Sequence, residues 1–148
     1  MILYTILIVA LSIIFFCLTD CRREQNQQTP SNVTLYDKPL WVIQSYIQGK
    51  WKLQYIEGGL AYRKIYIDTA NESINLSPSQ ILFLKNNILL LDTSLTWSYA
   101  NYVNAYVMNW SDRTGTSYFR EAEEIRNDTL ILYDTYADGY FYGYIRSN

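Results

Sequence analysis

The sequence predicts an all-β domain, an antiparallel up-and-down β-barrel of about eight strands preceded by one short helix and an apolar N-terminal segment. From residue 49 onward, hydrophobic and polar residues alternate with a period of two. Short turns rich in Gly, Asn and Asp separate these runs, and no second helical pattern follows. A sheet of this many strands must protect its edges, and closure into a barrel does so completely. A β-sandwich, whose core gives a similar pattern, is the alternative.

Size and composition limit the classes of function. The chain has 148 residues, which is enough for one domain with a core. Its 12 basic and 14 acidic side chains give a net charge of -2, so we expect no nucleic-acid partner. The absence of histidine excludes imidazole metal sites and Ser-His or Cys-His pairs. We therefore expect a protein that is not an enzyme and that uses no metal or cofactor.

The N-terminus has the layout of a signal segment. An almost unbroken apolar run from Ile2 to Leu18 ends at Leu18-Thr19-Asp20-Cys21, and a polar stretch with little apolar surface follows. This resembles the lipobox and tether of a bacterial lipoprotein of the Bacteroides type, in which Cys21 carries the lipid. The resemblance implies a signal peptide over 1–21, a tether over 22–36, a domain over 37–148 and anchoring to a membrane of the cell envelope. Plain secretion and an uncleaved anchor helix are the alternatives.

A short helix is expected just before the first strand. Asp37 is placed as its N-cap, Pro39 lies in its first turn, and Gly49 follows its end. Between them, apolar residues recur at helical spacing: Leu40, Trp41, Ile43, Tyr46 and Ile47. This stripe is expected to pack on the core or to lie across the mouth of a barrel.

The strands follow from Gly49 onward, where Trp51, Leu53 and Tyr55 alternate with polar residues. Further strands are expected in the runs 62–67, 74–76, 81–85, 88–91, 95–110, 117–125, 129–133 and 140–146. The run 95–110 is apolar or aromatic on both faces. One face would line the interior, and the other would lie under the helix or at a partner surface.

The domain resembles a known family. The helix leading into Gly49-Lys50-Trp51, the meander and the last strand up to Arg146 are similar to the lipocalin-like domain of bacterial lipoproteins. In the lipocalin superfamily, a Trp of the first strand closes the bottom of the barrel and an Arg of the last strand packs over it. The resemblance gives these structural roles to Trp51 and Arg146. Their side chains are therefore expected to be in contact, with the guanidinium over the indole.

Aromatic residues supply the binding hypothesis. The chain has 15 Tyr and four Trp, whose flat apolar faces and polar edges suit stacking and interfaces. The leading hypothesis is a lipid-anchored binding module that holds a small apolar or amphipathic molecule near Trp41, Tyr102, Tyr106 and Tyr142. The alternative is an envelope interaction protein that binds a protein or a glycan through a Tyr-rich surface.

A third hypothesis is a weak carbohydrate-active enzyme. On a strand, Glu121 and Glu123 would share one face at roughly 7 Å, a separation that glycoside hydrolysis can use. Their neighbours Arg120 and Arg126 also fit an ordinary charged strand face.

Overall fold

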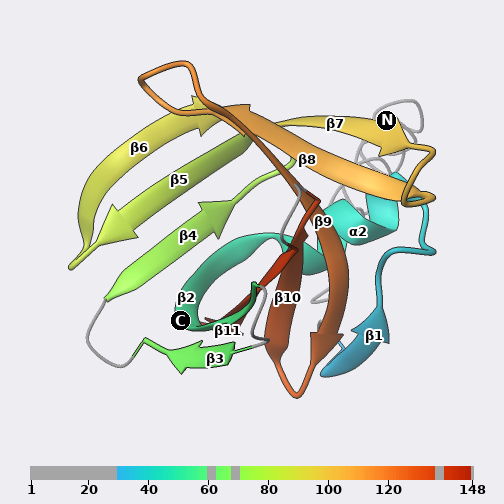
Figure 1. Ribbon diagram of the computed structural model, residues 1–148, viewed down its shortest axis with the longest axis horizontal. Coiled ribbons are helices and arrows are strands. Elements are labelled where there is room, and N and C mark those ends of the chain that lie inside the picture. Colours follow the sequence, from blue (N-terminus) through green and yellow to red (C-terminus); the bar gives the residue numbers. More distant parts are fainter. Residues whose placement is uncertain (1–29, 60–62, 68–70, 136–138, 148) are drawn as a thin grey trace, which may run out of the picture.

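The computed structural model describes residues 30–59, 63–67, 71–135 and 139–147 (Figure 1). The expected signal peptide over 1–21, with Cys21, therefore lies outside the described residues. The described chain forms one antiparallel sheet and one short helix, which confirms the predicted all-β fold. Within these ranges, no helix has the length and apolar character needed to cross a bilayer.

The described elements have the following bounds: β1 Asn32–Thr34, α2 Leu40–Ile47, β2 Gly49–Gly58, β3 Arg63–Tyr66, β4 Glu72–Leu76, β5 Gln80–Lys85, β6 Ile88–Ser94, β7 Thr96–Ala100, β8 Ala105–Ser111, β9 Ser117–Arg126, β10 Thr129–Asp134 and β11 Tyr140–Arg146. The order of strands across the sheet is β6-β5-β4-β2-β11-β10-β9-β8-β7. In addition, β1 pairs with β9, and β3 pairs with the second half of β2.

The topology is a meander whose first long strand lies beside its last. β2 and β11 pair along their length in the middle of the sheet, and the sheet ends at β6 and β7. Only Leu95 separates β6 from β7, so these two strands form one bent strand that pairs first with β5 and then with β8. Counted in this way, the nine strands of the main order make a meander of eight.

The sheet curls on itself into a half-barrel (Figure 1). β6 comes close to β8, although no ladder joins these two strands in the described ranges. All of the strands belong to one continuous sheet, whereas the alternative sandwich would need two separate sheets.

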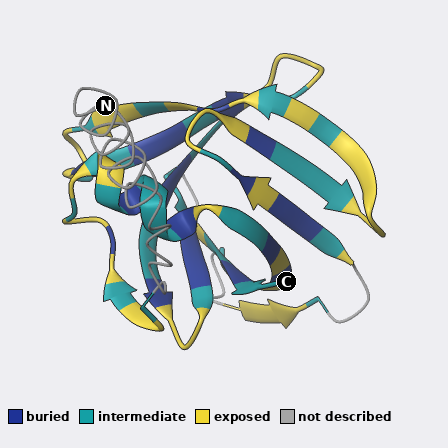
Figure 2. Cartoon of the chain, turned by 180° about the vertical axis from the view of Figure 1, so that it is seen from behind, coloured by how far each residue is buried: buried dark blue, intermediate teal, exposed yellow. Residues whose placement is uncertain are grey.

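The core fills the inside of the curl. Buried residues alternate with exposed ones in β2, whereas β8, β9 and β10 have buried residues in succession (Figure 2). The buried side chains include Ile74 of β4, Met108 of β8 and Leu130 of β10. Helix α2 packs on this core through Ile43 and Ile47, as its apolar stripe predicts.

The predicted contact between Trp51 and Arg146 is confirmed. The two residues are partners in the β2–β11 ladder, and the guanidinium carbon of Arg146 lies 4.2 Å from the centre of the Trp51 ring. The fully buried Trp51 donates its indole N–H to the carbonyl of Ile47 over 2.7 Å, and Arg146 donates to the carbonyls of Tyr46 and Gln48. These bonds fasten the end of α2 to the sheet.

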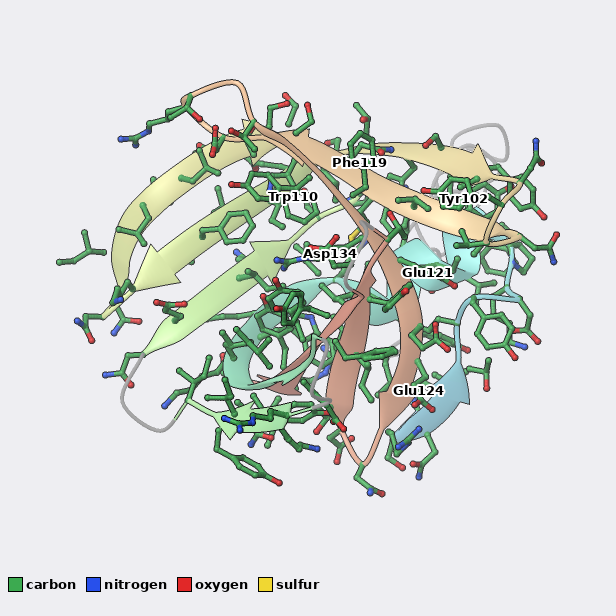
Figure 3. The ribbon with its side chains drawn as sticks, in the orientation of Figure 1. Tyr102, Trp110, Phe119, Glu121, Glu124 and Asp134 are labelled. Atoms are coloured by element: carbon green, nitrogen blue, oxygen red, sulfur yellow. The ribbon has the colours of Figure 1, made fainter. Side chains whose placement is uncertain are left out.

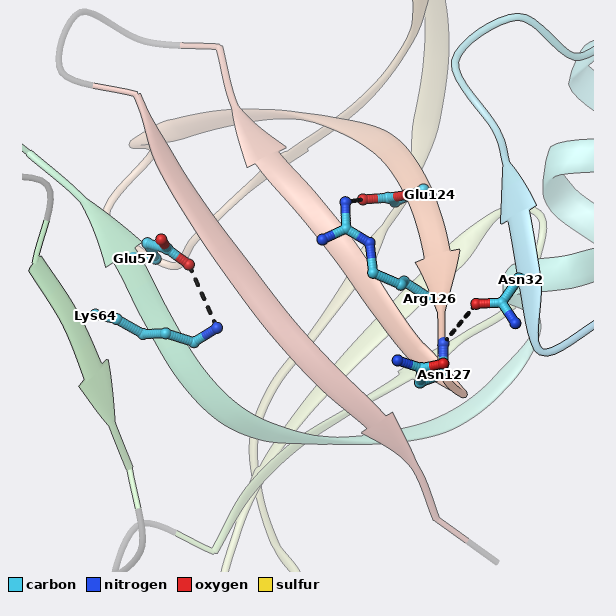
Figure 4. A network of polar contacts seen from close by, with 6 residues as sticks. All are labelled: Asn32, Glu57, Lys64, Glu124, Arg126 and Asn127. Atoms are coloured by element: carbon cyan, nitrogen blue, oxygen red, sulfur yellow. Dashed lines mark hydrogen bonds and ion pairs between the residues drawn. The ribbon is translucent and has the colours of Figure 1, made fainter.

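The fold begins before the predicted domain boundary at residue 37. β1 pairs with β9, Asn32 accepts a hydrogen bond from the backbone N–H of Asn127 (Figure 4), and Leu35 is fully buried. The sequence pattern places these residues in the tether because so short a strand has no detectable period. The predicted N-cap is also wrong. Pro39 occupies that position without a side-chain cap, and the Asp37 carboxylate pairs with Lys38.

The run 95–110 is a hairpin, not one long strand. β7 and β8 are joined by a turn over residues 101–104, in which Asn104 has a φ of 56°. The Asn104 side chain accepts a hydrogen bond from Tyr99 over 2.6 Å. Asn adopts this left-handed conformation more readily than most residues, so the chain turns here without Gly or Pro.

Candidate functional site

A cavity of about 170 Å³ lies between the two halves of the curled sheet. It begins two ladder pairs beyond the Trp51–Arg146 contact, where Leu53 of β2 lies opposite Tyr144 of β11. Most of its wall is apolar or aromatic. The lining residues are Leu53, Ile56, Glu72, Ser73, Ile74, Phe83, Leu84, Leu90, Arg120, Tyr142 and Tyr144.

Arg120 brings a positive charge to this wall. In β9 it lies opposite Met108 of β8 and Asp134 of β10, and it is only 8% exposed. Its guanidinium carbon lies 3.6 Å from the centre of the Tyr142 ring, and its Nη1 donates to the Tyr144 hydroxyl over 3.3 Å. The guanidinium is therefore held by one aromatic face and one hydroxyl, both from β11.

No acidic group neutralises Arg120 directly. None of the ion pairs among the described residues includes it, and its buried Nε has no hydrogen-bond partner there. Glu72, the acidic residue of the cavity wall, is paired with Lys85 over 2.9 Å. A buried cation without a partner anion is costly, so its surroundings favour the approach of a negative group.

Tyr144 is the polar partner of Arg120 in this wall. Burial raises the pKa of the Tyr144 hydroxyl, and the nearby positive charge of Arg120 opposes that rise. A raised pKa keeps the hydroxyl protonated near neutral pH. Tyr144 can therefore accept from Arg120 and still offer its own proton to another group.

A row of rings supports the cavity wall from β8 and β9. Trp110 stacks on Tyr118 with 5.6 Å between ring centres, and Phe83 packs against Trp110 at 5.7 Å. The Tyr118 hydroxyl donates to Asp112, which also accepts from Thr114. Hydrogen bonds led by the one from Thr114 lower the pKa of Asp112, so the carboxylate stays charged and holds the ring row in place.

The four aromatic residues predicted to bind a ligand do not surround one cavity. Tyr142 lines the cavity described above, whereas Trp41 projects from α2 and is 69% exposed. Tyr102 lies in the β7–β8 turn, well away from Trp110 in Figure 3, and it is 71% exposed. Tyr106 packs edge-on against Tyr99 at 5.3 Å. Only Tyr142 therefore remains a candidate contact for a molecule in the cavity.

Glu121 and Glu123 lie on β9 but neither lines the cavity. Glu121 has the opposite parity to Arg120, and Glu123 falls at a bulge in the β9–β10 ladder. Burial, together with the charge of Glu123, raises the pKa of Glu121 to about 7. Burial, and the charge of Glu124, also raise the pKa of Glu123.

The outer surface has a second hollow of about 350 Å³, and it is polar. It is lined by Lys50, Lys52, Asn71, Ser73, Asn86, Asn87 and Ser147. Lys50 already donates to Asn87 over 3.2 Å. The hollow therefore lacks the apolar wall that the inner cavity has.

Comparisons with known proteins do not assign a family. No protein-family model matches the chain, and neither the curated proteins nor the solved structures contain a significant match. In the described ranges, no three Asp, Glu or Cys side chains are grouped so that they could hold a metal ion. The lipocalin-like resemblance therefore stays a prediction.

Sequence reasoning missed Arg120 as a site residue. The charged run around Glu121 and Glu123 resembles a solvated strand face, which hides the fact that one of its members points inward. A usable signal exists in the parity of the strand. Arg120 lies two residues from Tyr118 and two from Ala122, which both face the core.

Proposed function

We propose that this protein is a non-enzymatic, lipid-anchored binding protein of the bacterial cell envelope that holds a small apolar or amphipathic molecule inside the curled sheet. The observation that supports this proposal is the inner cavity, whose wall combines aliphatic side chains with the polar groups of Arg120 and Tyr144. Binding sites for small molecules typically have such a wall, mostly apolar with a few placed polar groups.

The size of the cavity limits the ligand. Pockets for drug-sized ligands usually measure about 300–1,000 Å³, whereas this cavity measures about 170 Å³. The occupant is therefore a small molecule or one end of a longer one. In the second case the remainder would leave past Leu90 of β6, where the sheet ends.

Binding is tested with apolar fluorescent probes and by native mass spectrometry. We expect one probe per chain and a change in Trp emission, because Trp110 lies beside the cavity wall. Tyr142→Ala should change the affinity, since Tyr142 lines the cavity. Tyr102→Ala is the matched control and should leave the affinity unchanged, because Tyr102 is exposed in a turn. The absence of saturable binding across fatty acids, isoprenoids and aromatic probes would refute the proposal.

The anchor is tested separately at Cys21. If this residue is acylated, Cys21→Ser should release the protein from the membrane fraction or leave an unprocessed precursor, because anchoring depends on burial of the acyl chains. Metabolic labelling with a fatty-acid analogue should mark the wild type and not the variant. An unlabelled wild type would instead favour secretion or an uncleaved anchor.

A second candidate function is binding of a protein or a glycan by the outer surface. The observation in its favour is the exposure of large aromatic side chains, a residue type that is enriched at interfaces. The most exposed of these are Trp41, Tyr66 and Tyr102. Loss of partner capture in Trp41→Ala and Tyr102→Ala, with probe binding intact, would support this alternative.

A further inference from the structure

We propose that the inner cavity selects an organic anion, and that Arg120 binds the carboxylate of a small apolar acid. This inference rests on the proposed function and specifies the chemical class of the ligand. Its basis is the placement of one buried guanidinium in the wall of the cavity.

Arg120 brings a positive charge that no ion pair among the described residues neutralises. Arg120 carries a planar, cationic guanidinium, and only 8% of the residue is exposed. Glu72, the acidic residue of the cavity wall, is already paired with Lys85. The described groups that face the charge of Arg120 most closely are neutral: the rings of Tyr142 and Trp110 and the oxygen of Tyr144.

The guanidinium of Arg120 is held in place by two neighbours from β11. Nη1 of Arg120 donates to Tyr144, and one guanidinium face lies on Tyr142. The buried Nε has no partner among the described residues. A carboxylate accepts from the N–H groups along one edge of a guanidinium, often as a bidentate pair. The arrangement thus holds the guanidinium still, with Nε fully enclosed by protein, and leaves Nη2, which bonds to no described residue, for a carboxylate oxygen.

The apolar part of the cavity wall determines what can be attached to the carboxylate. The cavity wall next to Arg120 is formed by Leu53, Ile74 and Phe83, which offer no charge to a second polar group. With a volume of about 170 Å³, the cavity accommodates a short apolar chain or a single ring attached to the carboxylate. The acid is either a free short acid or the carboxylate end of a longer lipid. The dependence of affinity on the chain length of the acid distinguishes these two sources.

The test compares acids with their neutral counterparts on the purified protein, with Trp emission and calorimetry as readouts. We expect hexanoate to bind about tenfold or more tightly than hexanol, because a charged hydrogen bond is worth a factor of this order. Arg120→Met should remove that preference for the acid. Arg113→Met is the matched control, since Arg113 is exposed in the β8–β9 turn, and it should keep the preference. Dodecanoate binding more tightly than hexanoate would identify a lipid end, and the reverse order would identify a free short acid.

Two outcomes would overturn the inference, and they differ in reach. Hexanol binding as tightly as hexanoate to the wild type would refute the anion site and leave the proposed function in place. Saturable binding of neither would refute the anion site, and would refute the proposed function as well if the apolar probes named above also fail to bind. Because the acid and alcohol are compared on the wild type, this result does not depend on whether Arg120→Met folds. Tyr144→Phe provides a milder variant that removes the hydroxyl beside Nη1 and should reduce the preference for the acid.

Discussion

Trp51 and Arg146 concentrate the contacts that hold α2 to one end of the sheet. Trp51 is fully buried and bonded to the last residue of the helix, and Arg146 covers the indole while it bonds to Tyr46. The carbonyls at the end of a helix have no partner within the helix. Here the two side chains supply those partners and also close the core.

Truncation of these residues should therefore reduce stability unequally. Trp51→Ala should lower the free energy of unfolding by about 3–5 kcal/mol, since it removes a buried ring. That is a large part of the roughly 5–15 kcal/mol that holds such a domain together. Arg146→Ala should cost less, about 1–3 kcal/mol, for its hydrogen bonds and its place over the ring. Chemical denaturation measures both values.

A double-mutant cycle isolates the contact itself. We expect a coupling energy of about 0.5–2 kcal/mol between Trp51 and Arg146. Arg113→Ala, in an exposed turn, is the control for loss of an arginine and should leave stability unchanged. A coupling energy of zero would show that the two side chains stabilise the fold independently.

Glu121 should make stability depend on pH. Its pKa in the folded protein is raised from 4.5 to about 7, chiefly by burial, so folding favours its protonated form. The contribution to stability is present below pH 4.5 and is lost as the pH rises through about 7. Glu121→Gln should therefore raise the melting temperature at about pH 8 and have little effect at about pH 4. Glu57→Gln, which removes a carboxylate paired with Lys64 away from the β9 acidic residues, is the control and should show no gain at high pH.

At the scale of the elements, β11 requires a glycine in its centre. The ring of Tyr55 in β2 lies directly against Gly143, in the space where a Cβ would stand. The same ring carries the ammonium of Lys64 at 3.6 Å and packs on Tyr66 at 6.1 Å. Lys64 also pairs with Glu57, as Figure 4 shows. Gly143 thus allows β2 and β3 to share a cluster on the outer face.

Gly143→Ala should destabilise the protein by about 1–3 kcal/mol, because the added methyl group displaces the Tyr55 ring. The same substitution in a Tyr55→Ala background should cost much less, since the ring is then absent. Thermal unfolding of the four proteins measures this difference. Equal costs in both backgrounds would place the origin of the effect in the backbone of β11 and not in the ring.

The sequence predicts some elements well because their boundaries are chemically marked. Pro39 and Gly49 bracket α2, whose last residue is Ile47, and the alternation in 140–146 matches β11. The hairpin within 95–110 is hidden because its turn uses Asn104 in place of Gly or Pro. The cavity could not be predicted at all. It depends on the curl of the sheet, which brings Arg120 of β9 into one wall with residues of β4 and β5.

At the scale of the whole molecule, one end of the sheet is open to pairing with another chain. β6 is an end strand that exposes Ile88, Leu89 and Leu90 in succession. An apolar edge of this kind can pair with another chain. Ile88→Lys should therefore reduce self-association, as measured by sedimentation or light scattering. Asn101→Lys adds the same charge in an exposed turn and should have no such effect. Equal effects would point to net charge as the cause.

The pairing of β2 with β11 also determines when the protein can fold. Arg146 bonds to the carbonyl of Tyr46, 100 residues earlier in the chain, and the ladder between these strands joins the two halves of the sheet. A ribosome must therefore finish residues 140–146 before the central ladder can form. Contacts this distant in sequence are typical of domains that fold in milliseconds to seconds. Until then β2 keeps an open edge, so the nascent chain depends on protection from aggregation.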